Sequence, residues 1–492
     1  MAVRQRNGEI NMKKQVFNPY LPSYEYIPDG EPYVFGNRLY VYGSHDRFGG
    51  TKYCENDYVC WSAPINDLSD WRYEGVIYRK SSHPEDEVHK RTCLYAPDVV
   101  QGADGRYYLY YSMSDSSIMS VAVCDTPAGE YQYYGDIRDK DGTIVGNRAG
   151  DFHQFDPSIF IDDDGRIYLY SGFAPGKAED EAGRRFVGCH VSELEQDMLT
   201  IKNGPTLMIP KEWKKEEGAA YFEAPSMRKI KDTYYFVYSA RVTGLFYYYS
   251  KYPDRDFVFG GRIHSTSDIG INGHTEENPC YARGNIHGGI VCINHQYYIF
   301  DHRHTNHSSY QRQGVAEPIF FDENGQIEQV EATSCGLNGG PLAGKGTYPA
   351  YIACNLFYQK DIPNEKRLAC MTQDVEDIED IVTWQQEHDE NIPVQYLHAV
   401  SDGMIAGYKY FLIEDRIKEL TLTIRGQANG TLEVALGEEA QAIGKTEIVC
   451  NDMEWHKIMI SINIPQGKQA LFFRYYGEGS FDIQEFSFIS MD

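Results

Sequence analysis

The sequence predicts an all-β protein in which a five-bladed β-propeller is followed by a β-sandwich of jelly-roll type. Two observations carry this prediction. An aromatic-rich strand pattern recurs five times in the first two thirds of the chain, at intervals of 60 to 68 residues. In the last third, apolar and polar residues alternate along several runs separated by glycines. A recurring unit of short strands is typical of propeller blades, and alternation is typical of half-buried strands.

The repeated unit is an aromatic pair that follows a polar residue at a nearly constant distance. The pairs are Tyr40/Tyr42, Tyr108/Tyr110, Tyr168/Tyr170, Phe236/Tyr238 and Tyr298/Phe300. The polar residues, ten to thirteen positions before each pair, are Asp29, Asp98, Asp156, Glu223 and His287. Because the blades of a propeller surround a central channel, lined by the first strand of each blade, we expect these five side chains to converge. Four carboxylates and a histidine on one axis predict a catalytic centre.

Turn signals and a change in composition divide the chain. Pairs such as Asp164-Gly165 and Asn324-Gly325 separate the short strands up to about residue 330, and only Glu193–Leu199 suggests a short turn of helix. A stretch rich in Gly, Ser and Ala follows. We therefore expect an N-terminal extension over 1–17, the propeller over 18–332, a linker over 333–350 and the sandwich over 351–492.

Composition excludes some partners and favours others. The net charge of −26, without a basic run, makes nucleic acid and anionic membranes poor partners. The aromatic share of 14%, with 40 tyrosines, fits both β-sheet packing and stacking against sugars. The 11 cysteines show no paired spacing and the N-terminal stretch has no apolar core, so we expect reduced thiols and a cytoplasmic protein. The oligomeric state is left open.

Three carboxylates have surroundings that suggest different roles. Asp156 precedes an apolar strand and should point into the channel. Glu223 lies between aromatic residues and a proline, and such surroundings raise a carboxyl pKa and keep the group protonated. Asp29 lies in a polar Pro-Asp-Gly-Glu-Pro segment, which suits an ionised general base. Glu31 would lie on the same strand face as Asp29, so the residues alone leave the base open between these two.

The last repeat supplies basic residues. His287 is bracketed by glycines that allow a close backbone approach, and among carboxylates it is a candidate ligand for a metal ion or water. Arg303 is a fixed donor for hydroxyl groups or a carboxylate. A zinc site is not expected, because no cysteine or spaced carboxylate completes the nearby histidines, His302, His304 and His307. No nucleotide fingerprint or serine-hydrolase elbow is present, so we expect carboxylate chemistry without an organic cofactor.

Six short motifs within residues 18–332 together carry a family resemblance. They are Asn18-Pro19, Tyr95–Val99, Asp156–Gly165, Phe222–Pro225, Asn285–Gly289 and His302-Arg303. With them the chain resembles glycoside hydrolase family 43, a group of inverting enzymes built on five-bladed propellers. The resemblance implies that Asp156 tunes the pKa of a general acid, Glu223. An ungapped alignment places Asp29 at the position of the base, and we expect Asp29 to have this role; matching the acid-proline pair would select Glu31 at the cost of a gap.

The resemblance also implies ligands. His287 would hold a calcium or sodium ion, mostly through waters, and Arg303 would contact the substrate. Asp98 and Glu31 are further expected substrate contacts. The C-terminal part resembles family 6 carbohydrate-binding modules through two clues, Gly407–Phe411 and Arg425-Gly426.

The expected function is that of an inverting, exo-acting α-L-arabinofuranosidase, β-xylosidase or both. Its substrates would be oligosaccharides derived from arabinoxylan or xylan of the plant cell wall. Inversion requires an acid and a base whose carboxyl groups are roughly 6.5–9.5 Å apart, so that a water fits between base and sugar. Two alternatives are an endo-acting arabinanase or xylanase, which needs an open cleft, and a sugar-binding propeller without catalysis.

Overall fold

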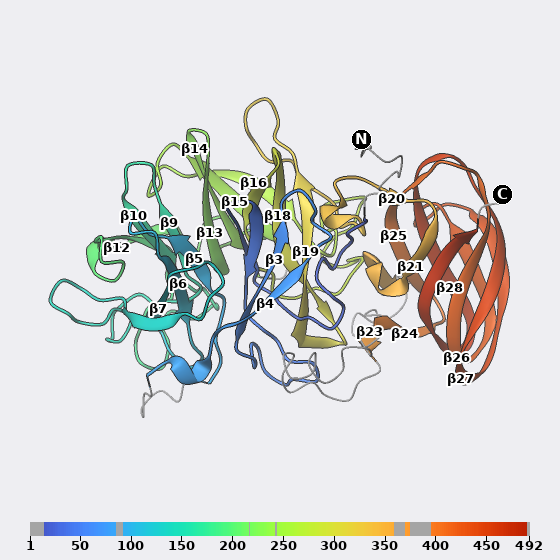
Figure 1. Cartoon of the computed structure of the whole chain (residues 1–492), viewed down its shortest axis with the longest axis horizontal. Coiled ribbons are helices and arrows are strands. Elements are labelled where there is room, and N and C mark those ends of the chain that lie inside the picture. Colours follow the sequence, from blue (N-terminus) through green and yellow to red (C-terminus); the bar gives the residue numbers. More distant parts are fainter. Residues whose placement is uncertain are drawn as a thin grey trace, which may run out of the picture.

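The computed structural model describes residues 14–84, 92–215, 217–241, 244–358, 370–373 and 395–489. Within these ranges the regular structure consists of β-strands and three short 3-10 turns, Lys80–Ser82, Gly336–Asn338 and Ala350–Ile352. The strands build a five-bladed propeller, blue to yellow in Figure 1, beside a separate C-terminal β-sheet domain drawn in orange and red. The predicted fold class is thereby confirmed. No helix in the described ranges has the length and apolar character needed to cross a membrane.

The blades are antiparallel sheets whose strands follow one another in sequence order. Blade 1 contains β1 (Glu31–Phe35), β2 (Arg38–Tyr42), β3 (Tyr58–Pro64) and β4 (Arg72–Tyr78). Blade 2 contains β5 (Asp98–Gln101), β6 (Tyr107–Ser112), β7 (Met119–Cys124) and β8 (Gln132–Asp136). Blade 3 contains β9 (Ser158–Ile161), β10 (Ile167–Ser171), β11 (Gly188–Leu194) and β12 (Ile201–Pro210). Blade 4 contains β13 (Glu223–Ile230), β14 (Thr233–Ser239), β15 (Leu245–Ser250) and β16 (Val258–His264). Blade 5 contains β17 (Ile290–Ile293), β18 (Gln296–Thr305) and β19 (Ser308–Ile319).

The recurring sequence pattern corresponds to one position in every blade. Each aromatic pair lies in the second strand, and each polar residue of the repeat lies at the start of the first strand or just before it. The rings pack between neighbouring blades, as Tyr170 of β10 and Phe236 of β14 do with ring centroids 6.2 Å apart. Aromatic rings bury a large apolar area and favour such offset contacts. The pattern recurs because every pair of blades needs the same packing.

The N-terminal segment closes the propeller by hydrogen bonding to blade 5 and the chain that follows it. The Tyr20 amide donates to the Gly314 carbonyl at 3.3 Å, and the Asn18 amide donates to the Ser334 carbonyl at 3.1 Å. The Asn18 side chain also donates to the Ala316 carbonyl at 3.0 Å. Buried polar groups are costly unless they are paired, so these bonds fix the first and last blades to each other. Of the expected N-terminal extension, residues 1–13 lie outside the described residues.

The predicted turns are present, but the predicted helical turn is wrong. Gly165 has a φ of 79°, a left-handed conformation that glycine adopts without strain, and its amide donates to the Asp162 carbonyl at 2.9 Å. The segment after β11 forms a tight turn instead of a helix. There the Asp197 side chain accepts hydrogen bonds from the amides of Leu199 and Thr200 at 3.0 and 2.8 Å. Such local bonds give the backbone an alternative to helical hydrogen bonding.

The C-terminal domain is a single hydrogen-bonded sheet of nine strands. They are β20 (Leu342–Ala343), β21 (Gly346–Pro349), β22 (Asn355–Tyr358), β23 (Cys370–Gln373), β24 (Gln395–Ser401), β25 (Met404–Ile413), β26 (Ile417–Ala435), β27 (Ala442–Ile464) and β28 (Gly467–Ile489). The alternating Leu420, Leu422 and Ile424 of β26 all lie in one apolar core, as their spacing predicts. A sheet that encloses its own core is compatible with the expected sandwich.

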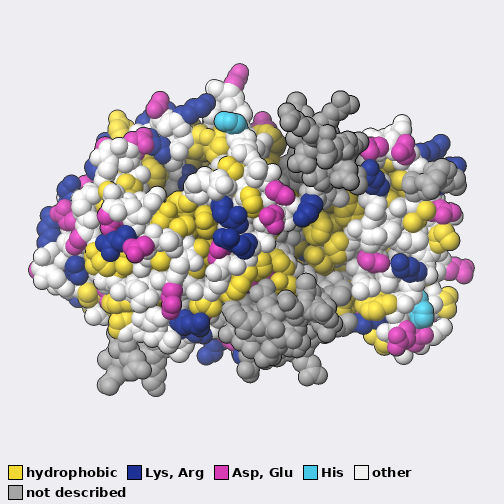
Figure 2. Space-filling view, in the orientation of Figure 1, with side chains coloured by type: hydrophobic (Ala, Val, Ile, Leu, Met, Phe, Trp, Pro, Cys, Tyr) yellow, Lys and Arg dark blue, Asp and Glu magenta, His cyan; other side chains and the backbone are white. Residues whose placement is uncertain are grey.

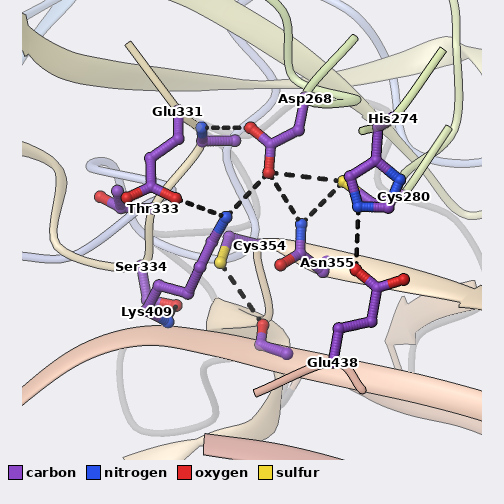
Figure 3. A network of polar contacts seen from close by, with 12 residues as sticks. Asp268, His274, Cys280, Glu331, Thr333, Ser334, Cys354, Asn355, Lys409 and Glu438 are labelled. Atoms are coloured by element: carbon purple, nitrogen blue, oxygen red, sulfur yellow. Dashed lines mark hydrogen bonds and ion pairs between the residues drawn. The ribbon is translucent and has the colours of Figure 1, made fainter. Parts of the chain in front are cut away.

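A buried polar network joins the two domains (Figure 3). The Lys409 ammonium of β25 is 4% exposed and lies 2.8 Å from Asp268 Oδ2 and 3.1 Å from Glu331 Oε2. A second contact, at 2.9 Å, joins His274 Nε2 to Glu438 Oε2. Removing one partner of a buried ion pair leaves an uncompensated charge, which is strongly unfavourable. The network therefore holds the C-terminal domain in place against the propeller.

Surface charge and thiol chemistry agree with the composition. On the face shown in Figure 2, Lys and Arg side chains are interspersed with Asp and Glu rather than gathered into one basic face. Ten cysteines whose side chains are described are free thiols.

Candidate active site

Asp29 is held as an ionised carboxylate at the start of blade 1. It lies two residues before β1, is 5% exposed, and its Oδ1 is 3.1 Å from Nη1 of Arg312. Burial alone would raise the pKa of Asp29, but the Arg312 guanidinium overrides it and the pKa falls to about 2. The backbone amide of Asp29 donates to Nδ1 of His302 at 3.1 Å, while Nε2 of His302 contacts the Asn285 carbonyl at 2.9 Å. These bonds define a neutral His302 that orients the Asp29 backbone.

Arg312 of β19 is a site residue that the sequence analysis missed. Its Nε and Nη2 atoms donate to the two carboxylate oxygens of Asp46 at 2.8 and 2.9 Å. This paired contact fixes the planar guanidinium, so that Nη1 faces Asp29. The guanidinium also lies over the Tyr53 ring, 4.8 Å from its centroid. Arg312 thus provides the fixed positive charge that keeps Asp29 ionised.

Asp156 and Glu223 lie in surroundings that raise their pKa values, in contrast to Asp29. Asp156 lies two residues before β9, Glu223 is the first residue of β13, and both side chains are buried. Burial, together with the negative charge of Asp29, raises the pKa of Asp156 to about 7. Burial and then the charge of Asp156 raise the pKa of Glu223 well above its usual 4.5. Glu223 therefore keeps its proton under conditions in which Asp29 is ionised.

His287 lies between two carboxylates. Its Nδ1 atom is 3.6 Å from Asp156 Oδ2, and its Nε2 atom is 3.8 Å from Glu31 Oε1. Neither His287 Nε2 nor Glu31 Oε1 has a hydrogen-bond partner among the described residues, although both are buried. A Cβ atom on Gly289 would lie 2.3 Å from Glu31 Oε2. The expected close backbone approach at the glycines after His287 is therefore present.

Glu31 and Asp98 are wholly buried and hold blades together. Glu31 Oε2 accepts hydrogen bonds from the Arg228 guanidinium and, at 3.1 Å, from the Ser226 hydroxyl. Asp98 accepts hydrogen bonds from the Tyr33 hydroxyl at 2.6 Å and the Ile159 amide at 2.7 Å. Because protein groups already donate hydrogen bonds to these carboxylates, the expected contacts of Glu31 and Asp98 with a substrate are not favoured. The pairing of Glu31 with Arg228 also favours Asp29 over Glu31 as the base.

Arg303 lies apart from the carboxylates, contrary to the expectation that it contacts substrate. Its Nη1 and Nη2 atoms donate to the carbonyls of Ala353 and Tyr351 at 2.7 and 2.6 Å, in the segment that leads into the C-terminal domain. Successive side chains of a strand point to opposite faces. Since His302 of β18 faces Asp29, its neighbour Arg303 must face away. Arg312 of the next strand is the arginine that reaches the site.

The structure thus brings five of the seven expected site residues together, and they are Asp29, Glu31, Asp156, Glu223 and His287. Among these residues, Asp29 is easily ionised and Glu223 easily keeps its proton, which is the combination that acid–base catalysis needs. Within the described ranges, no three His, Cys, Asp or Glu side chains are grouped so that they could hold a metal ion.

Comparisons with known proteins agree on one family. The model of the family "Glycosyl hydrolases family 43" matches residues 26–327. Over 483 residues the chain is 47% identical to a xylosidase/arabinosidase from Thermoclostridium stercorarium, covering 97% of this chain and 99% of that protein. It is 27% identical to xylosidase/arabinosidase 43A from Humicola insolens, over 61% of this chain and 96% of that protein.

Solved structures show the same fold. One is a family 43 β-xylosidase/α-arabinofuranosidase from a compost microbial metagenome, in complex with xylotriose and in a calcium-free form. The match has a TM-score of 0.51 and 23% identity, and it covers 63% of this chain and 97% of that one. The part of the chain that it leaves uncovered is comparable in size to the C-terminal domain.

Proposed function

The chain belongs to family 43 of the glycosyl hydrolases, and on this premise we propose that it is an inverting, exo-acting α-L-arabinofuranosidase and β-xylosidase. We propose oligosaccharides derived from arabinoxylan and xylan as its substrates. The 47% identity to a relative named xylosidase/arabinosidase supports this choice of sugars. The observation that carries the mechanism is the separation in pKa between Asp29, at about 2, and Glu223, well above 4.5.

Glu223 acts as the general acid. Its protonated carboxyl group donates a proton to the glycosidic oxygen as the bond to the leaving group breaks. Asp156 does not touch the reacting oxygen in this scheme. Burial of Glu223, and then the negative charge of Asp156, raise the pKa of Glu223 and so keep its proton available.

Asp29 acts as the general base. The ionised carboxylate removes a proton from a water molecule, which attacks the anomeric carbon from the face opposite to the leaving group. Arg312 keeps Asp29 ionised and fixes its orientation through the contact at 3.1 Å. Because the water attacks directly, the product sugar has the inverted anomeric configuration.

We propose that the site holds a calcium or sodium ion near His287, bound mostly through water. Two buried polar atoms, His287 Nε2 and Glu31 Oε1, lack hydrogen-bond partners in the described part of the chain and face each other across 3.8 Å. No protein group of three ligands is present there, so water would supply the other donors. When bound, the ion adds positive charge near the acidic cluster and lowers the repulsion among its carboxylates.

Removal of this ion should weaken the enzyme. After treatment with EDTA and desalting, we expect a lower kcat/KM for a nitrophenyl glycoside and a lower Tm, both restored by CaCl₂. The comparison is His287→Gln, which keeps a polar side chain but loses the imidazole and should respond less to EDTA. Unchanged activity and unchanged Tm in the wild type after chelation would remove calcium from the proposal and leave only sodium, which EDTA does not extract.

The proposed activity is tested with paired substrates. Wild-type protein should hydrolyse 4-nitrophenyl α-L-arabinofuranoside and 4-nitrophenyl β-D-xylopyranoside, and NMR should detect the inverted anomer as the first product. Release of single sugars from xylo-oligosaccharides indicates exo action, whereas longer products from polymeric xylan or arabinan indicate the endo-acting alternative. A protein that binds xylotriose but hydrolyses none of these substrates is a sugar-binding propeller, which contradicts the proposal.

The pH dependence follows from the two carboxyl groups. A general base works above its pKa, so Asp29 permits activity down to about pH 2. A general acid works below its pKa, so kcat/KM should fall on the alkaline side as Glu223 ionises, at a pH well above 4.5. Asp156→Asn removes a negative neighbour, lowers the pKa of Glu223 and should shift this alkaline limb to lower pH. The exposed Asp164→Asn variant serves as the control and should keep the wild-type profile.

A further inference from the structure

Four aromatic side chains form a continuous row beside the proposed acid. This aromatic row consists of Tyr95, Phe155, Phe173 and Phe222, and every member is half-buried. Ring centroids are 5.7 Å apart for Tyr95 and Phe155, 4.8 Å for Phe155 and Phe173, and 5.2 Å for Phe173 and Phe222. These distances are those of aromatic rings in contact. The row therefore presents one connected apolar surface rather than four separate rings.

The chain connects the aromatic row directly to the catalytic carboxylates. Phe155 precedes Asp156, and Phe222 precedes Glu223. Phe173 follows β10, and the next amide, that of Ala174, donates to the Phe222 carbonyl at 2.8 Å. The row is thus fixed to the entry points of blades 3 and 4, on the side of the site that holds the protonated carboxyl group.

The two sides of the site differ in character. On the side of the base, Asp29 and Asp46 share the Arg312 guanidinium, so the surroundings are charged and hydrogen-bonded. On the side of the acid, the rings of the row adjoin Asp156 and Glu223 along the chain, with the Arg241 guanidinium 5.8 Å from the Phe222 ring centroid and His287 Nδ1 3.6 Å from Asp156 Oδ2. The rings of Tyr170 and Phe236, which pack blades 3 and 4 together, are 0% exposed, whereas each ring of the row keeps some exposed surface. The incomplete burial of the row means that part of its apolar surface remains open for contact with a ligand.

We propose that the aromatic row is the subsite for the leaving-group sugar, an inference that rests on the proposed function. The general acid must contact the glycosidic oxygen, so the departing part of the substrate lies next to Glu223. The row occupies that side of the site. A neutral xylose unit presents C–H groups on the faces of its ring, and these pack on aromatic surfaces, whereas its hydroxyl groups stay in water. The row thereby favours substrates in which a further sugar, not a small group, departs.

The test compares leaving groups in Phe173→Ala, with Phe173 chosen because it touches both neighbouring phenylalanines. We measure kcat/KM for xylotriose and for methyl β-D-xylopyranoside, whose methyl group is too small to reach the row. The ratio of the two values should fall about tenfold, the equivalent of about 1.4 kcal/mol. Phe173→Leu keeps an apolar side chain without an aromatic face, and its ratio should lie between those of the wild type and Phe173→Ala.

The matched control is Phe160→Ala. Phe160 is a half-buried phenylalanine of β9 in the same blade, but it packs on Tyr234, with ring centroids 6.0 Å apart, and not on the row. This variant should show a comparable loss in Tm and an unchanged ratio. If the ratio of the two kcat/KM values also falls in Phe160→Ala, general loosening of blade 3, and not the row, causes the effect.

Failure of this inference and failure of the proposed function give different results. If the wild type cleaves both substrates and Phe173→Ala keeps the wild-type ratio, the row is not the leaving-group subsite and the proposed function stands. If the wild type cleaves neither, the proposed β-xylosidase activity is wrong and the inference falls with it. Calorimetry on Glu223→Gln adds a readout without turnover, because xylotriose should bind more weakly when Phe173→Ala is added.

Discussion

Replacing Asp29 by asparagine is expected to lower kcat by about 10²–10⁴-fold on every substrate, with a small loss in Tm. Asparagine has the shape of aspartate but cannot accept a proton from water, so the attack on the anomeric carbon loses its base. The fold should persist because Arg312 keeps its paired contact with Asp46 at 2.8 and 2.9 Å. Steady-state kinetics with the two nitrophenyl glycosides, together with thermal unfolding, measure both effects.

Glu31→Gln is the matched comparison, since Glu31 is the other candidate base. It removes one partner of the buried pair with Arg228, a change that typically destabilises a protein by about 3–5 kcal/mol. We therefore expect a large drop in Tm and, in the protein that remains folded, a kcat much closer to that of the wild type. The reverse result, with activity lost in Glu31→Gln and kept in Asp29→Asn, would assign the base to Glu31.

The propeller could be predicted from the sequence because its packing is repetitive. Every blade buries the same side of its second strand, so pairs such as Tyr108/Tyr110 recur at the same place in β6 and in its counterparts. The polar residue at or just before the start of each first strand recurs at the same spacing, so it could be predicted in the same way. The turn after β11 could not be predicted in this way, because the bonds that the Asp197 side chain makes to two amides decide it locally.

Part of the site follows from the period, and part depends on partners that the period cannot show. Asp29, Asp156 and Glu223 lie where the repeat places them. Asp98 occupies the same position in blade 2, but the Tyr33 hydroxyl and the Ile159 amide bind it within the protein. These partners come from blades 1 and 3, so only the folded structure reveals them.

The two arginines of blade 5 illustrate the same limit. Arg303 was favoured because it follows a histidine of a recognised motif, yet strand alternation turns it toward the carbonyls of Ala353 and Tyr351. Arg312 carries no motif. The available signal was a charged residue inside a long, otherwise well-buried strand, β19, because such a charge needs a carboxylate partner. The sequence could suggest that partner's chemistry but not that it would be Asp29.

Replacing Glu223 by glutamine should remove acid catalysis selectively, and this effect depends on the leaving group. Glutamine keeps the size of the side chain but has no proton to transfer, so departure of a sugar, a poor leaving group, should slow by about 10²–10⁴-fold in kcat. A 2,4-dinitrophenyl glycoside needs little protonation and should lose far less.

The same substitution should flatten the alkaline limb of the pH profile, because the group whose raised pKa produces that limb is gone. Asp29→Asn lacks the base instead, so its activity should fall about equally on sugar and dinitrophenyl leaving groups, and the two variants separate the two roles. Equal losses on both leaving groups in Glu223→Gln, with the alkaline limb unchanged, would show that another residue supplies the proton. The raised pKa of Glu223, which burial and the neighbouring Asp156 produce, argues against that outcome.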